Sequence, residues 1–328
     1  MSEKTNFSPN PTAAREPRLH AESEQQATSQ PRSWPVFMGE NGLRTGWRIF
    51  IFFAITLAIA IGAIKIFGLA PQPGLMTPGV AVLAEAISVL SMLVATAFVA
   101  RFEHRSIGSY GLALRRGFLG RFLLGSLWGF VPLSLLMLAM YSLHVVKFSG
   151  PDLAGGALLR AALLWMVTMT FTGIFEESFM RGYPLFALAR SMRFWPAALV
   201  TSVIFALIHL NNSGEAVVGI IGAFVVALVF CLMLRRTGDL WFPIGCHFGW
   251  NYGETCVFGV SNSGFRSTGH LLTAHVHGSH WLTGGSVGPE GSLLAFLAVA
   301  FMAVTFHFAF PRVRLESVAP SPRFSWRG

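Results

Sequence analysis

The stretch "FEESFMRGY", residues 175–183, places two adjacent glutamates and an arginine inside one of the most apolar regions of the chain. Burying such charges in hydrocarbon costs several kcal/mol unless they are paired or take part in chemistry. Glu177 and Arg181 are four residues apart, so on a helix they lie on one face and pair. Glu176 is rotated by about 100° and has no local cation. The stretch therefore predicts a membrane helix with one neutralised glutamate and one available for chemistry.

The composition supports a membrane location. Of 328 residues, 53% are hydrophobic and only 12% are charged, whereas soluble domains carry roughly 25% charged residues. The apolar residues also occur in long runs, which predicts an integral, multi-pass membrane protein. The net charge of +9 is distributed beside these runs, which favours membrane anchoring and argues against a nucleic-acid partner.

Eight segments have about the 20 mostly apolar residues that a spanning helix needs. They are residues 48–69, 79–100, 121–143, 156–178, 195–210, 215–234, 242–260 and 291–310. The predicted fold is therefore all-α, a polytopic transmembrane helix bundle with about eight spans.

The lysines and arginines predict the orientation of this bundle. With the N-terminus in the cytoplasm, all of them except Lys65, Lys147, Arg160 and Arg266 fall on the cytoplasmic side. Because cytoplasmic loops are enriched in these residues, both termini are predicted to be cytoplasmic. An even number of spans agrees with this.

Three regions follow from the same patterns. Residues 1–44 are polar and rich in Pro, Ser, Gln and Glu, which predicts a disordered cytoplasmic tail. Residues 45–311 form the transmembrane helical domain, and residues 312–328 a cytoplasmic C-terminal tail. The loop at 261–290 carries four histidines, for which we favour a solvated loop over a weak metal site. These histidines are His270, His275, His277 and His280.

Three further polar residues lie in predicted spans. His209 closes the apolar stretch "FALIHL", and "CHFGWN" places His247 and Asn251 four residues apart on one helical face. Histidine acts as a base, an acid or a metal ligand, and an asparagine amide donates to a developing oxyanion. Glu176 and His209 lie at nearly equal distances along the chain from a predicted turn near Arg193, which places them level. A simple count places His247 nearer the cytoplasmic end.

Each of these residues also has a structural interpretation. A lone histidine packs through hydrogen bonds as often as it catalyses, and a Glu–Arg pair can act as a latch. Glu85 in the second span has no identifiable partner, and we predict a structural role for it. The co-occurrence of two carboxylates, two histidines and an asparagine in a chain poor in such groups favours a functional site.

The motifs resemble those of a known family. "EESFMR", "FALIH" and "HFGWN" match the patterns Glu-Glu-x-x-x-Arg, Phe-x-x-x-His and His-x-x-x-Asn. In this order, across consecutive membrane helices, they resemble the CPBP family of intramembrane endopeptidases. That family includes the type II CAAX prenyl proteases and proteins linked to bacteriocin processing and self-immunity. The resemblance covers about residues 100–260.

The resemblance implies roles for individual residues. Glu176 would be the catalytic carboxylate and would activate a water together with His209. His247 and Asn251 would stabilise the tetrahedral oxyanion, while the pair of Glu177 and Arg181 would hold the site in shape.

Two mechanisms fit this residue set. The metal-free version, which needs no cofactor, is preferred. In the metal-dependent version Glu176, His209 and His247 would bind Zn²⁺ and leave an open position for water. No compact His-Glu-x-x-His motif is present to support zinc.

The predicted function is that of an intramembrane endopeptidase of the bacterial inner membrane. Its site would lie among spans four to seven and be reached from the cytoplasmic side. Its partners would be the lipid bilayer and a peptide or protein substrate, membrane-associated or lipidated. The alternative is a non-catalytic membrane scaffold or immunity-type binding protein. A proton-coupled transporter is a third reading, since proton relays also use Glu and His within helices.

Overall fold

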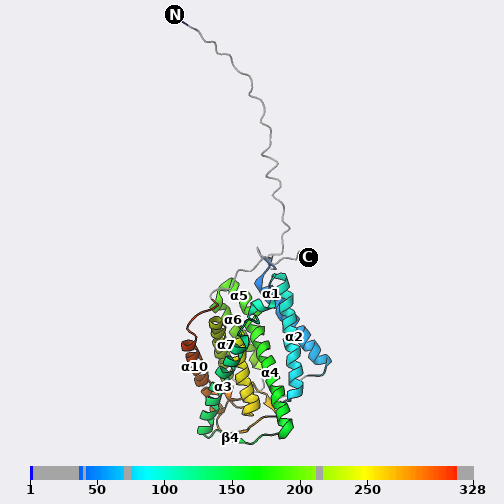
Figure 1. Ribbon diagram of the computed structural model, residues 1–328, viewed down its shortest axis with the longest axis vertical. Helices are drawn as coiled ribbons and strands as arrows, with labels where there is room; N and C mark the ends of the chain where they lie inside the picture. The colour runs from blue at the N-terminus through cyan, green and yellow to red at the C-terminus, as the bar shows by residue number, and fades with distance from the viewer. Residues whose placement is uncertain (3–36, 40–41, 70–74, 212–216, 316–328) are drawn as a thin grey trace.

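The computed structural model describes residues 1–2, 37–39, 42–69, 75–211 and 217–315. The described part is mostly helical, and its long helices lie side by side in one bundle (Figure 1). The α-helices are α1 (Thr45–Ile66), α2 (Pro78–Phe102), α3 (Phe118–Ser142), α4 (Gly155–Arg181), α5 (Tyr183–Met192), α6 (Phe194–Ile208), α7 (Val217–Thr237), α8 (Trp241–Tyr252), α9 (His280–Thr283) and α10 (Leu293–Ala309).

Short elements connect these helices. Three are 3₁₀ turns and one, η3, is π-helical; they are η1 (Ile107–Tyr110), η2 (His209–Asn211), η3 (Gly253–Val257) and η4 (Pro289–Gly291). The strands are β1 (Met38–Gly39), β2 (Gly42–Leu43), β3 (Leu75–Met76), β4 (Val146–Ser149), β5 (Arg266–Ser267) and β6 (Thr273–Val276).

The predicted all-α, polytopic bundle is confirmed, whereas the count of eight spans is not. Five segments of the described chain are long and apolar enough to cross a membrane: α1, α2, α3, α4 continued by α5, and α7. Helices α6 and α10 are apolar but shorter. Helix α8 has 12 residues and continues directly into the π-helical η3 at Gly253. Together they make residues 241–257 helical, close to the span predicted at 242–260, and a long loop follows.

The predicted tails lie largely outside the described residues. Within the N-terminal one, β1 and β2 pair antiparallel, with Met38 opposite Leu43. Within the C-terminal one, the backbone N–H groups of Arg314 and Leu315 donate to the carbonyl of Arg235 at 3.1 and 3.0 Å. These two hydrogen bonds attach the described end of the chain to α7.

Helices α3 and α8 pack at unusually close range through glycines. A Cβ atom built on Gly129 would lie 1.9 Å from the carbonyl oxygen of Cys246, and one built on Gly249 would lie 2.0 Å from that of Ser126. Each helix carries a Gly-x-x-x-Gly pair, which lets two membrane helices approach closely. The position of α8, and of His247 on it, therefore depends on this glycine contact.

A buried carboxylate joins the helices at the end of the bundle where α1 begins. Glu103 is fully buried, and its carboxylate pairs with Arg48 of α1 and Arg190 of α5. The hydroxyls of Tyr110 and Tyr183 each donate to it at 2.9 Å. Burial by itself raises the pKa of Glu103, but the two arginines and the Tyr110 hydrogen bond lower that pKa below its ordinary value. The ionised carboxylate thus holds α1, α2 and α5 together.

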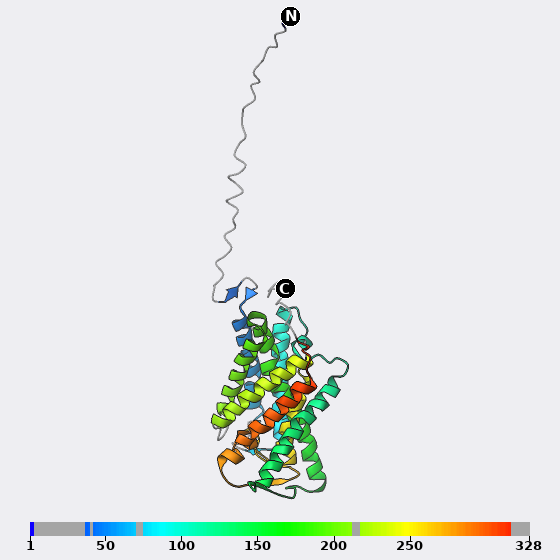
Figure 2. The same cartoon turned by 90° about the vertical axis from the view of Figure 1, so that its left-hand side faces the viewer.

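The loop predicted as solvated, 261–290, is held in place at the opposite end of the bundle, near β4 (Figure 1). Within it β5 pairs with β3, and β6 pairs with β4. The carboxylate of Asp152 also accepts hydrogen bonds from the backbone of Gly269 and His270, at 2.7 and 2.8 Å. Three of the four histidines are exposed, as a solvated loop predicts, and His270 is buried. Helix α10 then crosses the bundle obliquely between α3 and α7 (Figure 2).

We expect Gly129→Ala to lower the midpoint of thermal unfolding in detergent by several degrees. The added methyl must displace the α8 backbone, and overpacking of this kind costs about 1–3 kcal/mol. Gly120→Ala is the matched control, because nothing lies within 4 Å of a Cβ at that position of α3. Equal midpoints for the two variants would contradict the close contact.

We also expect Glu103→Gln to destabilise the protein at neutral pH by about 3–5 kcal/mol, because it leaves two buried arginines without their carboxylate. The lowered pKa means that Glu103 stabilises the fold above its unfolded pKa near 4.5 and loses that contribution as pH falls toward the folded pKa. Unfolding midpoints measured between pH 7 and 3 should fall more steeply for wild type than for the variant. Identical slopes would show that Glu103 does not titrate as described.

Candidate functional site

A cavity of about 720 Å³ lies within the bundle, between α1, α2, α4, α6, α7, α8 and α10. Its walls are mostly apolar, with a small group of polar side chains. All four residues predicted to act on the substrate line it: Glu176, His209, His247 and Asn251. The structure therefore places His247 in the same cavity as His209, although a simple count from the sequence placed it nearer the cytoplasmic end.

The predicted ion pair on α4 is present beneath the cavity. The guanidinium of Arg181 donates from Nη1 to Oε1 of Glu177 at 2.8 Å, and both side chains are almost completely buried. Arg181 also donates from Nε to the carbonyl of Ala227 at 3.3 Å and lies over the ring of Phe205. The arginine therefore links α4 to both α6 and α7.

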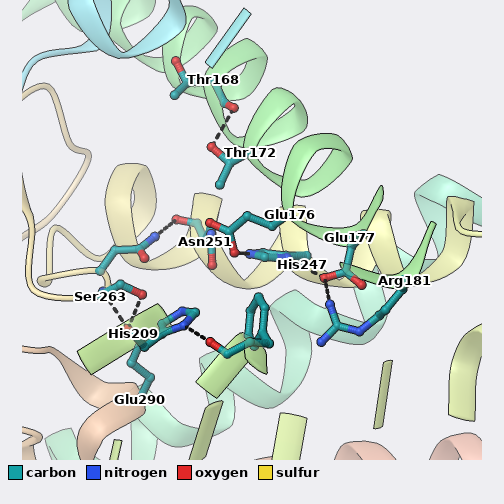
Figure 3. Close-up of polar contacts among 12 residues, drawn as sticks. Thr168, Thr172, Glu176, Glu177, Arg181, His209, His247, Asn251, Ser263 and Glu290 are labelled. Carbon is teal, nitrogen blue, oxygen red and sulfur yellow. Dashed lines mark hydrogen bonds and ion pairs between the residues drawn. The ribbon is translucent and has the colours of Figure 1, made fainter. Parts of the chain in front are cut away.

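His247 lies between the two glutamates (Figure 3). Its Nδ1 is 3.0 Å from Oε1 of Glu177, and its Nε2 is 3.7 Å from Oε2 of Glu176. Because the Glu177 carboxylate already accepts from Arg181, Nδ1 of His247 carries the hydrogen of this bond. The adjacent glutamates thus have different environments: Glu177 is fully buried with two partners, and Glu176 is one-third exposed toward the cavity.

His209 is oriented by the end of its own helix. Its Nδ1 lies 2.8 Å from the carbonyl oxygen of Phe205, which can only accept, so Nδ1 carries a hydrogen. In the neutral ring this leaves Nε2 as an acceptor. The residue starts the 3₁₀ turn η2, where α6 ends, and this position allows its ring to line the cavity.

The predicted face of α8 is confirmed, with His247 and Asn251 one turn apart on it. The start of the helix is held by Asp239, whose carboxylate accepts from the Trp241 N–H at 3.2 Å and pairs with Arg121 of α3 at 2.9 Å. The first backbone N–H groups of a helix have no acceptor within the helix, and this carboxylate accepts a hydrogen bond from one of them. The depth of His247 is thereby fixed relative to α3.

Six polar residues that the sequence analysis did not assign to the site also line the cavity. They are Glu85, Thr168, Thr172, Asn262, Ser263 and Glu290. The side-chain amide of Asn262 donates to the carbonyl of Asn251, and Glu290 accepts from both the backbone N–H and the hydroxyl of Ser263. The three loop residues follow α8, outside the motif-bearing region. For Glu85, the sequence feature that could have indicated a site residue was a carboxyl group within a predicted span.

The cavity is larger than the site expected among spans four to seven. The cavity is walled by α1, α2 and α10 as well as by the predicted spans four to seven. It is also lined by Met76 of β3 and by Phe265, which precedes β5. In the predicted topology both residues lie on the outer side of the membrane, and the expected approach from the cytoplasmic side stays a prediction.

The three alternative zinc ligands, Glu176, His209 and His247, all line the cavity. Across the described residues, no group of three or more His, Cys, Asp or Glu side chains is placed so that it could hold a metal ion. The metal-dependent version stays a prediction.

Comparison with known proteins finds a family model that matches part of the chain. Residues 158–253 match the family model described as "Type II CAAX prenyl endopeptidase Rce1-like". The matched segment contains all six predicted site residues, which lie on α4, η2 and α8. The search of curated proteins found no match. The resemblance to the CPBP and CAAX protease family is thus confirmed for this segment.

We expect Arg181→Gln to be strongly destabilising, because it leaves the buried Glu177 carboxylate with only His247. Breaking a buried ion pair from one side costs about 3–5 kcal/mol. Arg160→Gln on the exposed part of the same helix serves as the matched control. Thermal unfolding in detergent should separate the two variants, and a wild-type midpoint for Arg181→Gln would contradict a structural role for the pair.

Proposed function

We propose that this chain, whose residues 158–253 carry the type II CAAX prenyl endopeptidase domain, hydrolyses peptide bonds with a water activated by Glu176 and His209. The observation that carries the proposal is the unequal environment of the two adjacent glutamates. Glu177 is held by Arg181 and His247, whereas Glu176 faces the cavity with no arginine or lysine partner among the described residues. A carboxylate of this kind suits a general base.

In the proposed reaction a water lies between Glu176 and Nε2 of His209. Glu176 accepts a proton as the water oxygen attacks the carbonyl carbon of the peptide bond. The bond then breaks, and the proton on Glu176 passes to the leaving amine nitrogen. The immediate products are a carboxylic acid and an amine. The second proton of the water then passes from the acid to the amine, which gives a carboxylate and an ammonium group, and Glu176 is again ionised.

The carbonyl oxygen becomes an oxyanion during the attack. His247 and Asn251 of α8 are the proposed donors to it, from a ring nitrogen and a side-chain amide. For this role His247 needs a hydrogen on Nε2 in addition to the one that Nδ1 donates to Glu177. A protonated ring between two carboxylates, with Arg181 beside one of them, leaves the four side chains without net charge.

The cavity supports a membrane-associated protein or peptide as substrate. Leu57 of α1 and Ile208 of α6 line the cavity and are also 44% and 46% exposed. The wall between these helices is therefore part of the outer surface that a bilayer would cover. A lipidated chain end is one form of such a substrate, and the bacterial inner membrane, eight spans and cytoplasmic termini remain predictions.

We expect Glu176→Gln and His209→Ala each to reduce peptide hydrolysis at least about a hundredfold, within the range by which general acid–base catalysis accelerates a reaction. The measurement uses purified protein in detergent and a quenched peptide library with free and lipidated ends. Unfolding midpoints near the wild-type value would show that both variants are folded.

The same assay, repeated with a chelator, distinguishes the two mechanisms. Activity unaffected by the chelator is the result expected for the metal-free reaction. Loss of activity that Zn²⁺ restores would instead favour the metal-dependent version. Full hydrolysis by Glu176→Gln would refute the role of Glu176, and no hydrolysis by folded wild type on any peptide would favour the non-catalytic scaffold.

A further inference from the structure

A third membrane carboxyl, Glu85 of α2, has no role in the proposed reaction although it lines the same cavity. It interacts electrostatically with Glu176 and His247, which places it near the proposed site of bond cleavage. Its Oε2 atom is buried and has no hydrogen-bond partner within the described chain. An oxygen of this kind is an exception among buried polar groups, most of which have partners.

The polar neighbour of Glu85 satisfies it only in part. Thr172 of α4 is a side-chain hydrogen-bond partner of the carboxyl, and its hydroxyl also donates to the carbonyl of Thr168 at 3.1 Å (Figure 3). A hydroxyl has a single hydrogen, which is shared between these two acceptors. The Oε2 atom of Glu85 therefore keeps an unused capacity to accept hydrogen bonds.

Two other buried carboxylates contrast with Glu85, whereas a third, Glu254 of η3, also has no ion-pair partner within the described chain but does not line the cavity. Glu103 is held by two arginines and two tyrosines, and Glu177 by an arginine and a histidine. Their partners are what make burial of the charge tolerable. Glu85 has no comparable set, so a structural role like theirs does not account for it.

The ionisable groups that line the cavity are mostly acidic. Among the described residues that line it there are three carboxyl side chains, Glu85, Glu176 and Glu290, and no lysine or arginine. Only the two histidines can add positive charge. A ligand that brings a cation to Glu85 would satisfy its oxygen and offset the excess of carboxyl groups in a medium of low dielectric constant.

We propose that Glu85 is a specificity-determining residue that binds a cationic side chain of the substrate, a lysine ammonium or an arginine guanidinium. The inference rests on the proposed function, because it assigns the substrate class of that same cavity. Because Glu85 interacts with Glu176 and His247 in the same cavity, the basic residue lies close in sequence to the bond that is cut. A peptide with an acidic residue at that position would be disfavoured.

The test measures binding separately from hydrolysis. Fluorescent apolar peptides that differ only in one central Lys, Gln or Glu are titrated against the full chain carrying Glu176→Gln, reconstituted in nanodiscs. This background removes the neighbouring carboxylate, so any remaining charge preference reports on Glu85. Glu85→Gln is then added, and Ser88→Ala, one turn further along α2, is the matched control because Ser88 does not line the cavity.

We expect the Lys peptide to bind about tenfold or more tightly than the Gln peptide, and the Glu peptide most weakly, as for a partly buried ion pair worth about 1.4 kcal/mol. Glu85→Gln should remove the preference, and Ser88→Ala should keep it. A preference that survives in Glu85→Gln would overturn the proposal. So would equal binding of the three peptides, since it would mean that Glu85 carries a proton rather than a charge, and so would no binding of the Lys peptide.

Hydrolysis by the chain with Glu176 intact is measured on the same peptides. Selective binding of the Lys peptide without any cleavage would contradict the proposed function and leave the role of Glu85 in place. Cleavage of all three peptides at equal KM would retain the proposed function and reject the role of Glu85.

Discussion

The arrangement of the site depends on the hydrogen bonds that join the Glu177 carboxylate to Arg181 and His247. One of its oxygens accepts from Arg181 on the same helix and lies 3.0 Å from Nδ1 of His247 on α8. An arginine and a second hydrogen-bond partner allow a carboxylate to remain buried in a membrane bundle. Through this oxygen α4 and α8 keep a fixed relation, and Glu176, the adjacent residue, is turned toward the cavity. The neighbour of an immobilised glutamate is thereby left free for chemistry.

Two further contacts keep these helices in position. The glycines of α3 and α8 allow the two backbones to approach closely, and Asp239 with Arg121 ties the start of α8 to α3. At the end where α1 begins, Glu103 binds Arg190 of α5 and the hydroxyl of Tyr183, which follows α4 directly. In a bilayer, where burial of apolar surface between helices adds little, packing of this kind and buried polar pairs provide much of the association.

Features set by local spacing could be predicted from the sequence. The pairing of Glu177 with Arg181 and the shared face of His247 and Asn251 both follow from the period of a helix. The order of the motifs was sufficient to indicate the family whose model matches residues 158–253. Hydropathy correctly indicated a helical membrane bundle, in which five segments of the described chain are long and apolar enough to cross a membrane.

Features set by contacts between distant segments could not be predicted in this way. Glu85 is far in sequence from Glu176 yet lines the same cavity, and Ser263 and Glu290 reach it from a loop with no periodic pattern. The loop that follows η3 is fixed in the same way, by hydrogen bonds to Asp152 and by strand pairing. Sequence spacing carries no information on these long-range pairings.

The central claim is that the two adjacent glutamates have separate tasks, and paired isosteric substitutions test it most directly. Peptide hydrolysis per folded molecule and the unfolding midpoint are measured for Glu176→Gln and Glu177→Gln under the same conditions. The account predicts that Glu176→Gln loses hydrolysis and keeps its midpoint, while Glu177→Gln loses stability by about 3–5 kcal/mol because Arg181 is left buried without its carboxylate. An active Glu176→Gln, or a Glu177→Gln as stable as wild type, would contradict it.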